Sequence, residues 1–311
     1  MSQGMSQGMS RVIGILGQGA WGRALAQVAR QAGLDVHVWS RASPDITALA
    51  AADALIVAVP AQAVRAVLSA VKPVVVKGQP VIIAAKGIEQ ESGLFMHEVV
   101  ADVLPEAAAM VLSGPSFAAD VTNSLPTAVV LAAQRLEDAT SWAAALSLPF
   151  FRIYASGDVK GVEIGGALKN VLAIACGISD GRGLGDSARA ALTTRGFAEL
   201  IRFAARLGAK PETVLGLSGL GDLLLTCSSR QSRNYCFGRA IGEGLGVTEA
   251  LASISGVVEG AATVRIAHAL AHRLQVEMPI VDAVHAIVDA GAAPEEEIAR
   301  LLARPLRPEF T

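Results

Sequence analysis

Apolar residues recur with two different periods along this 311-residue chain, and the change comes just after Tyr154. Before that point, short apolar strands alternate with amphipathic helical segments, which is typical of an α/β fold with a mainly parallel sheet. After it, the apolar spacing is helical throughout. We therefore predict an α/β domain over residues 11–155 and an all-α domain over residues 156–311. Residues 1–10 repeat the polar letters MSQG and are predicted to be a flexible tail.

The same pattern gives the expected elements. The predicted strands run from Arg11 to Leu16, Asp35 to Trp39, Ala54 to Ala58, Val81 to Gly87, Met110 to Ser113, Thr127 to Leu131 and Phe150 to Tyr154. The expected helices include Ile46 to Ala51, Gln62 to Val71, Gly157 to Gly181, Asp186 to Leu207, a segment capped by Ser232, and a segment that follows VVEG and ends at Arg273.

The first strand runs directly into Gly17, Gly19 and Gly22, which open a helix. This is G-x-G-x-x-G in the strand, turn and helix context of dinucleotide sites. The first glycine permits the turn, the second admits the pyrophosphate, and the third lets the helix pack closely. A chance triplet is the alternative in a chain with 31 glycines. The context favours dinucleotide binding.

The second strand ends in Ser40 and Arg41, where an NAD-specific site usually has a carboxylate for the ribose. An arginine there can pair with a 2′-phosphate, so we predict NADP(H) as the cofactor and leave NAD(H) open. The alternative for Arg41 is a solvated loop charge. Trp21, beside the glycine turn, is assigned to packing.

The segment from Gly157 to Gly181 is a long apolar helix that carries Lys169 and Asn170 at its middle. Gly161, Gly165 and Lys169 share one helix face, so we expect room for a ligand beside the ammonium group. Burial should lower the pKa of this amine toward the working range of an acid–base catalyst. The alternative is a lysine that reaches the surface.

Two further segments carry polar groups suited to a small anion. Lys86 lies at the C-terminal end of the predicted strand from Val81 to Gly87, and the ends of parallel strands are where open sheets bind ligands, although a surface charge is the alternative. Asp222 follows a glycine-rich turn. Ser232 is a plausible N-cap that places Arg233 and Asn234 in the first helical turn, beside orphan amides, which predicts a compact phosphate site. The alternative is an ordinary capped surface helix.

Composition narrows the class of protein. The 26 basic and 28 acidic residues nearly balance, which argues against nucleic acid or an anionic membrane as the main partner. Cys176, Cys227 and Cys236 show no zinc-ligand or CxxC spacing, so we expect reduced thiols in a cytoplasmic protein without a stable membrane anchor.

No metal site is predicted from the histidines. His268, His272 and His285 lie on expected helices, and the sequence shows no carboxylate or cysteine arranged around them. Packing or surface roles are therefore expected for all three.

Several long motifs together resemble the bacterial-type NAD(P)-dependent glycerol-3-phosphate dehydrogenases. The motifs, which span Arg11 to about Arg304, are GQGAWG, AAKGIE, SGPSFA, GGALKNVLAIACGISDG, DSARAALTTRGFAE, GLSGLGDLLLTCSSRQSRN and VVEG. The resemblance implies a Rossmann-type domain joined to a helical domain. It also implies interconversion of dihydroxyacetone phosphate, a small phosphorylated triose, with sn-glycerol 3-phosphate for glycerophospholipid synthesis.

The resemblance also implies residue roles, matched position by position. Lys169 is the implied proton donor and acceptor, without a metal. The implied substrate contacts are Lys86, Gly114, Ser116, Lys169, Asn170, Asp222, Ser232, Arg233 and Asn234. The implied dinucleotide contacts, with the glycines, are Ala20, Trp21, Arg41, Lys86, Ala118, Arg233, Val257 and Glu259.

One segment departs from the family pattern. Between Arg41 and the strand at Ala54 the family has a considerably longer connection, so a strand and a helix near the adenosine end are expected to be missing. The catalytic motifs are intact.

Two other functions fit parts of the pattern. A 3-hydroxyacid dehydrogenase also uses a helical-domain lysine and asparagine, but it does not need the anion site at Arg233. A redox sensor that binds NADPH has no need of Lys169, Asp222 and Arg233 together. The sequence leaves the oligomeric state open, with a homodimer as one outcome.

Overall fold

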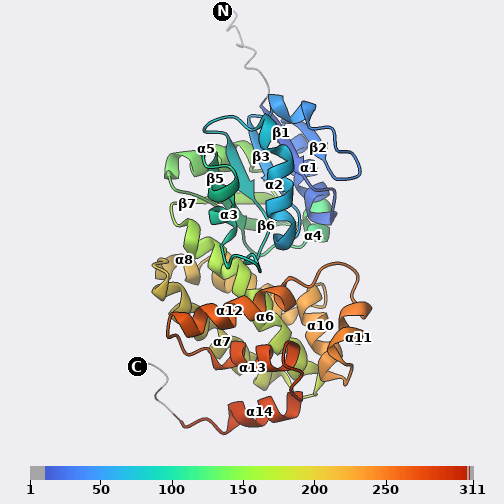
Figure 1. Ribbon diagram of the computed structural model, residues 1–311, viewed down its shortest axis with the longest axis vertical. Helices are drawn as coiled ribbons and strands as arrows, with labels where there is room; N and C mark the ends of the chain where they lie inside the picture. The colour runs from blue at the N-terminus through green and yellow to red at the C-terminus, as the bar shows by residue number, and fades with distance from the viewer. Residues whose placement is uncertain (1–10, 307, 309–311) are drawn as a thin grey trace, which may run out of the picture.

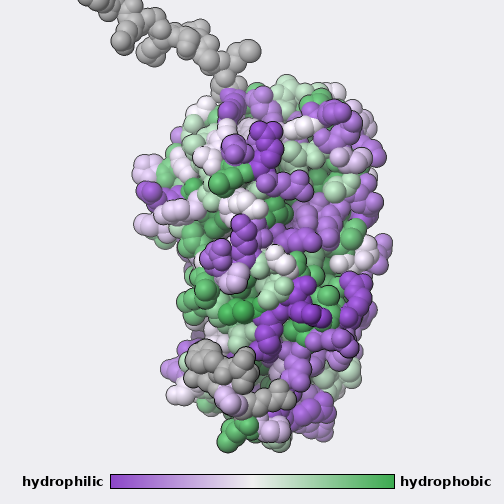
Figure 2. All heavy atoms as spheres, turned by 90° about the vertical axis from the view of Figure 1, so that its left-hand side faces the viewer, coloured by the Kyte–Doolittle hydropathy of each residue, from purple (hydrophilic) through white to green (hydrophobic). Residues whose placement is uncertain are grey.

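The computed structural model describes residues 11–306 and 308, so the tail predicted at residues 1–10 lies outside the described residues. A sheet flanked by helices forms one end of the molecule and a bundle of helices forms the other, stacked along the long axis (Figure 1). The space-filling view shows the two ends in continuous contact, with hydrophilic side chains spread over both (Figure 2).

The sheet has seven strands in the order β2-β1-β3-β4-β5-β6-β7 within the described residues, and only the β5–β6 pair is antiparallel. This confirms the predicted α/β class with a mainly parallel sheet. The strands are β1 (Val12–Leu16), β2 (Asp35–Trp39), β3 (Ala54–Val57), β4 (Pro80–Ile83), β5 (Ala108–Ser113), β6 (Thr127–Ala133) and β7 (Phe151–Ser156).

Helices cover both faces of the sheet because its strands are apolar on both sides. The helices α1 (Ala20–Gln31), α4 (Ala118–Thr122) and α5 (Leu136–Leu146) share one core with one face. The helices α2 (Val64–Val71) and α3 (Met96–Val103) share a second core with the other face. Short 3₁₀ turns are η1 (Thr47–Ala51), η2 (Ala61–Ala63) and η3 (Lys72–Val74).

After β7 the described chain is helical, as predicted. Its elements are α6 (Val159–Gly181), α7 (Asp186–Arg206), α8 (Pro211–Leu215), the π-helical turn η4 (Leu217–Gly221), α9 (Asp222–Ser228), α10 (Arg233–Gly242), α11 (Val247–Ser253), α12 (Glu259–Arg273), α13 (Pro279–Val288) and α14 (Pro294–Leu302). The division into domains at residue 155 stays a prediction.

Three predicted elements differ in detail. The strand expected from Val81 to Gly87 ends at Ile83, because pairing with β3 and β5 stops there and the next residues leave the sheet. The helix expected over Ile46 to Ala51 is the 3₁₀ turn η1. The helix expected from Gln62 begins as the 3₁₀ turn η2 and becomes α-helical at Val64.

The central helix α6 joins the two ends of the molecule. Asp158 caps it by accepting a hydrogen bond from the Gly161 amide at 2.9 Å, and Glu163 accepts one from the backbone amide of His97 in α3 at 3.0 Å. The first turn of α6 packs into a sheet core, and the rest forms the centre of the helical core. Although α6 is long and apolar enough to cross a bilayer, its apolar window is entirely buried in the protein.

Close approach of α6 and α10 depends on glycines in both helices. A Cβ atom on Gly177 would lie 2.1 Å from the carbonyl oxygen of Tyr235, and one on Gly238 would lie 2.1 Å from that of Ile174. These distances are far below van der Waals contact, so the two backbones must separate if either position carries a side chain.

We therefore expect Gly177→Ala to lower the free energy of unfolding by about 1–3 kcal/mol, the usual range for overpacking. The matched control is Gly157→Ala, because Gly157 has no atom within 4 Å of the added Cβ. Urea and thermal unfolding of both variants would check this. Equal stability of the two variants would contradict the close packing of α6 on α10.

Candidate active site

The glycine turn has the geometry predicted for a dinucleotide site. Gly17 has φ of +119°, a conformation that L side chains rarely adopt. A Cβ on Gly22 would lie 2.1 Å from the Gly17 carbonyl oxygen, so this glycine lets α1 pack against the turn. Gly19 is exposed and has no atom within 4 Å of an added Cβ. The middle glycine is therefore open to an approaching ligand.

Four of the other residues predicted to contact the dinucleotide lie at the starts of α1 and α4 and after β2. Ala20 and Trp21 begin α1, and Ala118 begins α4, which packs beside it. Trp21 and Ala118 are partly buried against the sheet core, which confirms a packing role for Trp21. Arg41 is exposed immediately after β2.

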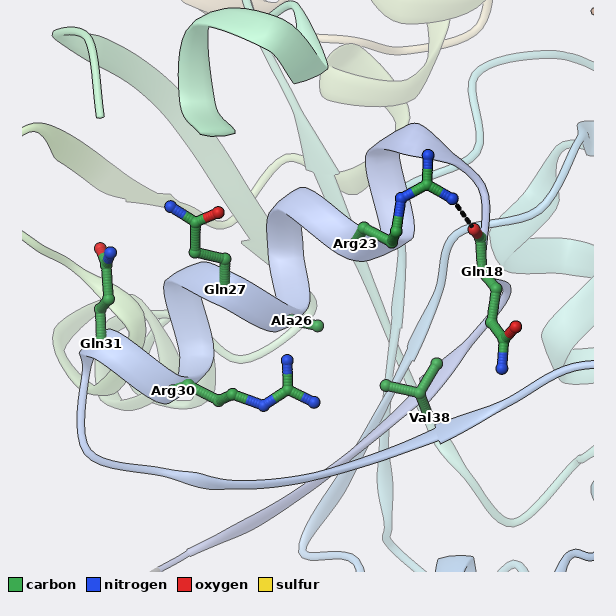
Figure 3. A pocket seen from close by; sticks show the side chains of 7 residues that line it. All are labelled: Gln18, Arg23, Ala26, Gln27, Arg30, Gln31 and Val38. Carbon is green, nitrogen blue, oxygen red and sulfur yellow. Dashed lines mark hydrogen bonds between the residues drawn. The ribbon is translucent and has the colours of Figure 1, made fainter. Parts of the chain in front are cut away.

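A pocket of about 530 Å³ lies on the outer side of α1, next to the turn. Figure 3 shows Arg23 directed at Gln18, whose carbonyl oxygen accepts its hydrogen bond at 2.6 Å, while Arg30 extends toward Val38 of β2. The pocket is lined by Gln18, Arg23, Ala26, Gln27, Arg30, Gln31 and Val38. The pocket therefore lies at the β2 edge of the sheet, and neither Lys86 nor Lys169 lines it.

Two lysines, one from the sheet region and one from the helical region, both pair with the Asp222 carboxylate. The Lys169 ammonium pairs with Asp222 Oδ1, and the Lys86 ammonium lies 2.7 Å from Asp222 Oδ2. Lys86 also donates to the Gly114 carbonyl oxygen at 2.9 Å, and Lys169 donates to Thr226 Oγ1 at 2.9 Å. Two ammonium groups share one buried carboxylate, which leaves a positive charge at this point.

Burial changes the acidity of the central amine. The Lys169 side chain is almost fully buried, and desolvation, the largest effect, lowers its pKa to about 8 even though the Asp222 carboxylate acts to raise it. At pH 7 the group is then about nine-tenths protonated, and it can lose and regain a proton near neutral pH. This confirms the pKa direction expected from the sequence.

The glycine face next to Lys169 serves a different purpose from the one predicted. We expected Gly161 and Gly165 to leave room for a ligand. A Cβ on Gly161 would meet Asp158 and Thr213, and one on Gly165 would lie 2.5 Å from the Ser218 carbonyl oxygen. The expectation was wrong because the protein's own η4 and α8 region fills that space.

The asparagines form a second layer behind the lysine cluster. Asn234 donates to Asn170 Oδ1 at 2.9 Å, and its own Oδ1 accepts from the Gly260 amide at 2.8 Å. Asn170 also lies 3.5 Å from the Lys86 carbonyl oxygen. The two side chains therefore fix α6, α10 and α12 relative to one another.

The start of α12 reaches across to the sheet region. Glu259 accepts a hydrogen bond from the Ala61 amide at 3.2 Å, while its buried Oε2 has no partner in the described part of the chain. Desolvation, the largest effect, raises the pKa of this carboxyl to about 7. A buried oxygen without a partner is costly unless a ligand or water supplies one.

The predicted anion site has the expected local structure. Ser232 caps α10, where its hydroxyl accepts from the Tyr235 amide at 3.2 Å, so this side chain is already used. Arg233 is exposed in the first turn and donates to the Val257 carbonyl oxygen at 3.3 Å. Ser116 is half-buried, with its hydroxyl 3.0 Å from the Gly114 carbonyl oxygen.

Sequence reasoning missed some polar groups in this region. Thr226 bridges Lys169 and Asp222, and its i,i+4 spacing from Asp222 was the available signal. Ser113 and Thr263 carry buried hydroxyls without a partner in the described residues. An added Cβ on Gly166 would lie 2.7 Å from Ser113 Oγ and 3.4 Å from Lys86 Cγ, which places that hydroxyl beside Lys86.

The structure also corrects the expectation for the histidines. His268 Nδ1 lies 2.8 Å from Asp282 Oδ1, His272 Nε2 lies 3.6 Å from the same oxygen, and His285 Nε2 lies 3.2 Å from Asp289 Oδ2. Carboxylates do surround these rings. The contacts of Asp282 could not be seen in the sequence, because Asp282 lies on α13 and His268 and His272 lie on α12, whereas the four-residue spacing of His285 and Asp289 was an available signal.

Comparison with known proteins agrees with this geometry. A sequence model described as NAD-dependent glycerol-3-phosphate dehydrogenase C-terminus matches residues 158–299, and the corresponding N-terminus model matches residues 12–47 and 41–139. The break between the two N-terminal pieces falls in the shortened connection after β2.

Curated relatives match over nearly the whole chain. Proteins named glycerol-3-phosphate dehydrogenase [NAD(P)+] from Parvibaculum lavamentivorans and Caulobacter vibrioides are 46% and 47% identical, and each match covers 96% of this chain and 98% of the relative. A crystal structure of glycerol-3-phosphate dehydrogenase from Coxiella burnetii is 37% identical, with a TM-score of 0.89 over 95% of this chain and 99% of that one.

The shared carboxylate leads to a prediction about acidity. Asp222→Asn should lower the pKa of Lys169 below its value of about 8, because the charge that opposes desolvation is removed. An NMR titration of the lysine Cε resonances would measure it. The matched control is Glu106→Gln, which removes an exposed partner 3.5 Å from Lys77. An unchanged or higher pKa of Lys169 in Asp222→Asn would rule out the proposed electrostatic balance.

Proposed function

Since the chain belongs to the family of NAD-dependent glycerol-3-phosphate dehydrogenases, we propose that Lys169 is its proton donor and acceptor. The protein is an NAD(P)-dependent oxidoreductase that interconverts dihydroxyacetone phosphate and sn-glycerol 3-phosphate. This family membership decides against the 3-hydroxyacid dehydrogenase and redox-sensor alternatives. The observation that carries the proposal for Lys169 is its buried ammonium, paired with Asp222, whose other carboxylate oxygen pairs with Lys86 from the segment after β4.

In the proposed mechanism, NAD(P)H held at the glycine turn would supply, when bound, the hydride for the ketone carbon of the substrate. The Lys169 ammonium then protonates the oxygen as negative charge develops on it. Because the pKa of Lys169 is about 8, the amine can give up this proton near neutral pH. Lys86 adds a second positive charge 2.7 Å from the same carboxylate, and fixed positive charge stabilises a developing alkoxide more than a neutral carbonyl.

We assign the substrate phosphate to the start of α10. The guanidinium of Arg233 and the first-turn amides of Arg233 and Asn234 are suited to a dianion. The Asn234 side chain is held by Asn170 and Gly260, so it contributes position rather than a free donor. Ser116 and the Gly114 turn lie on the sheet side, next to Lys86, where they would contact the triose.

The groups at the glycine turn and at the start of α1 are suited to a dinucleotide. Gly17, Gly19 and Gly22 with Ala20, Trp21 and Ala118 would hold the pyrophosphate and its surroundings at the start of α1. Glu259 has a buried oxygen without a partner in the described residues, and with Val257, Lys86 and Arg233 it would contact the cofactor beside the substrate. We propose that residues 11–155 bind mainly the dinucleotide and residues 156–311 mainly the substrate.

Arg41 supports a preference for NADP(H) over NAD(H). It follows the edge strand β2, where the adenosine ribose of a Rossmann-type site lies, and it is exposed to solvent. We further propose a cytoplasmic enzyme, without a stable membrane anchor, that supplies glycerophospholipid synthesis and assembles as a homodimer.

The first test is Lys169→Ala. Turnover with dihydroxyacetone phosphate should fall by about 10²–10⁴, because the proton donor is lost, while the Kd for NADPH stays unchanged. Steady-state absorbance assays and fluorescence titration would measure the two quantities.

The contrast variant is Arg233→Ala, which should mainly raise KM for dihydroxyacetone phosphate, since it removes a charge from the phosphate site. Normal turnover in Lys169→Ala would refute the role of the lysine. An unchanged KM in Arg233→Ala would remove that guanidinium from the phosphate site.

The second test addresses cofactor preference. Arg41→Ala should weaken NADPH binding about tenfold, because roughly one charge-assisted pair with the 2′-phosphate is lost. Binding of NADH, which has no 2′-phosphate, should be nearly unchanged. Arg135→Ala is a suitable control, because Arg135 is exposed and pairs with Asp138 at the start of α5. Equal losses for the two cofactors would count against a 2′-phosphate contact.

A further inference from the structure

A cluster of imidazole and carboxylate groups joins α12 to α13 at a place that the proposed reaction does not use. His268 and His272 are one helical turn apart on α12, and Asp282 comes from α13. One ligand atom from each of the three residues lies within 4.8 Å of the others.

We propose that His268, His272 and Asp282 form a binding site for a divalent transition-metal ion of the Zn²⁺ class, separate from the dehydrogenase site. The candidate ligand atoms are His268 Nδ1, His272 Nε2 and a carboxylate oxygen of Asp282.

Asp282 approaches both imidazoles, one of them through a hydrogen bond, at distances near those of ligands that share an ion. In a tetrahedral zinc site with bonds of about 2.0–2.1 Å, neighbouring ligand atoms lie about 3.3 Å apart. Here Asp282 Oδ1 lies 2.8 Å from His268 Nδ1 and 3.6 Å from His272 Nε2. The second distance is too long for a hydrogen bond, yet it needs only a few tenths of an ångström of adjustment to bind a common ion.

The surroundings hold the ligands in place. The His285 ring stacks parallel on His268, with centroids 4.0 Å apart and an interplanar angle of 3°. His285 in turn faces Asp289, which Arg265 holds through contacts of 2.8 and 2.6 Å. The stacked ring limits the rotation of the His268 imidazole, and the ion pair of Asp289 with Arg265 holds His285 in that position.

The charge and access of the cluster also suit a cation. Asp282 borders a groove of about 200 Å³ between α13 and α14, and the arginines there have their own carboxylates: Arg300 pairs with Glu297 and Arg304 with Glu277. The His272 side chain is 65% exposed, so an ion can reach the site from solvent.

The choice of ion follows from the donors. Two imidazoles and one carboxylate suit Zn²⁺, Ni²⁺ or Cu²⁺ rather than Mg²⁺ or Ca²⁺, which prefer oxygen donors. Three protein ligands leave a position for water. Because the ligands come from two helices, a bound ion would hold α12 against α13 and stabilise the helical end of the chain.

The test uses the full chain freed of metal by a chelator and titrated with Zn²⁺ against a competing indicator. We expect one saturable site per chain and a Tm about 5 °C higher when free Zn²⁺ reaches a hundredfold excess over Kd. His272→Ala and Asp282→Asn should each weaken binding by at least about tenfold and reduce the rise in Tm. Dehydrogenase activity of metal-free His272→Ala should equal that of the metal-free wild type.

Two control variants separate this site from adventitious binding. His37→Ala removes an exposed histidine of β2, and Cys236→Ser removes a half-buried thiol of α10. Neither should change Zn²⁺ affinity. Three results would overturn the proposal. They are loss of Zn²⁺ binding in Cys236→Ser, a Zn²⁺ affinity of His272→Ala and Asp282→Asn equal to that of the wild-type chain, and no saturable binding to the wild-type chain up to about 100 µM Zn²⁺.

Co²⁺ gives a second measurement that does not depend on the variants folding. Co²⁺ bound to the wild-type chain should show the visible bands of a nitrogen- and oxygen-ligated ion. A thiolate charge-transfer band would place the metal on a cysteine instead and refute the site.

Discussion

The arrangement of the active site depends on one buried carboxylate that holds two ammonium groups from different parts of the chain. Asp222 has no exposed surface, and its two oxygens accept from Lys169 of the helical region and Lys86 of the sheet region. A charge buried this deeply is stable only when it is paired, so the carboxylate and the lysines require one another. The surplus positive charge then lies at the boundary between the two ends of the molecule, where both ligands of a dehydrogenase must meet.

Close backbone packing makes this burial feasible. Glycines in α6 let η4 and α10 approach the helix so closely that added side chains would collide with backbone atoms at about 2–3 Å. The segment that follows η4 begins α9 with Asp222, and α10 carries Arg233 and Asn234. The helix that supplies Lys169 therefore also fixes the position of its counter-ion and of the proposed phosphate site. Water is excluded from the amine, which is why desolvation dominates its pKa.

The sequence was sufficient for the features set by local rules. The alternation of periods, the glycine turn, the Ser232 cap and the long apolar helix each follow from spacing and residue type, and all are present. Features set by tertiary packing were not accessible. The glycine face of α6 gave no sign that protein rather than ligand fills it, and the Asp282 carboxylate comes within reach of His268 only when α12 and α13 pack together. The roles of the site residues in binding remain proposals.

The shortened connection after β2 shows which part of the fold the chemistry needs. Within the described residues β2 is the edge of the sheet, and only η1 lies between it and β3, so an outer strand and helix are absent there. The glycine turn does not depend on them, because the Gly17 amide donates a hydrogen bond to the Trp39 carbonyl oxygen, and β1 is paired on both sides. The cluster of Lys86, Lys169 and Asp222 is built from the segments that follow β4 and β5 and from the helical region, well along the sheet from that edge. The short connection therefore bears on how the adenosine end of a cofactor would be held, and it leaves Lys86, Lys169 and Asp222 in place.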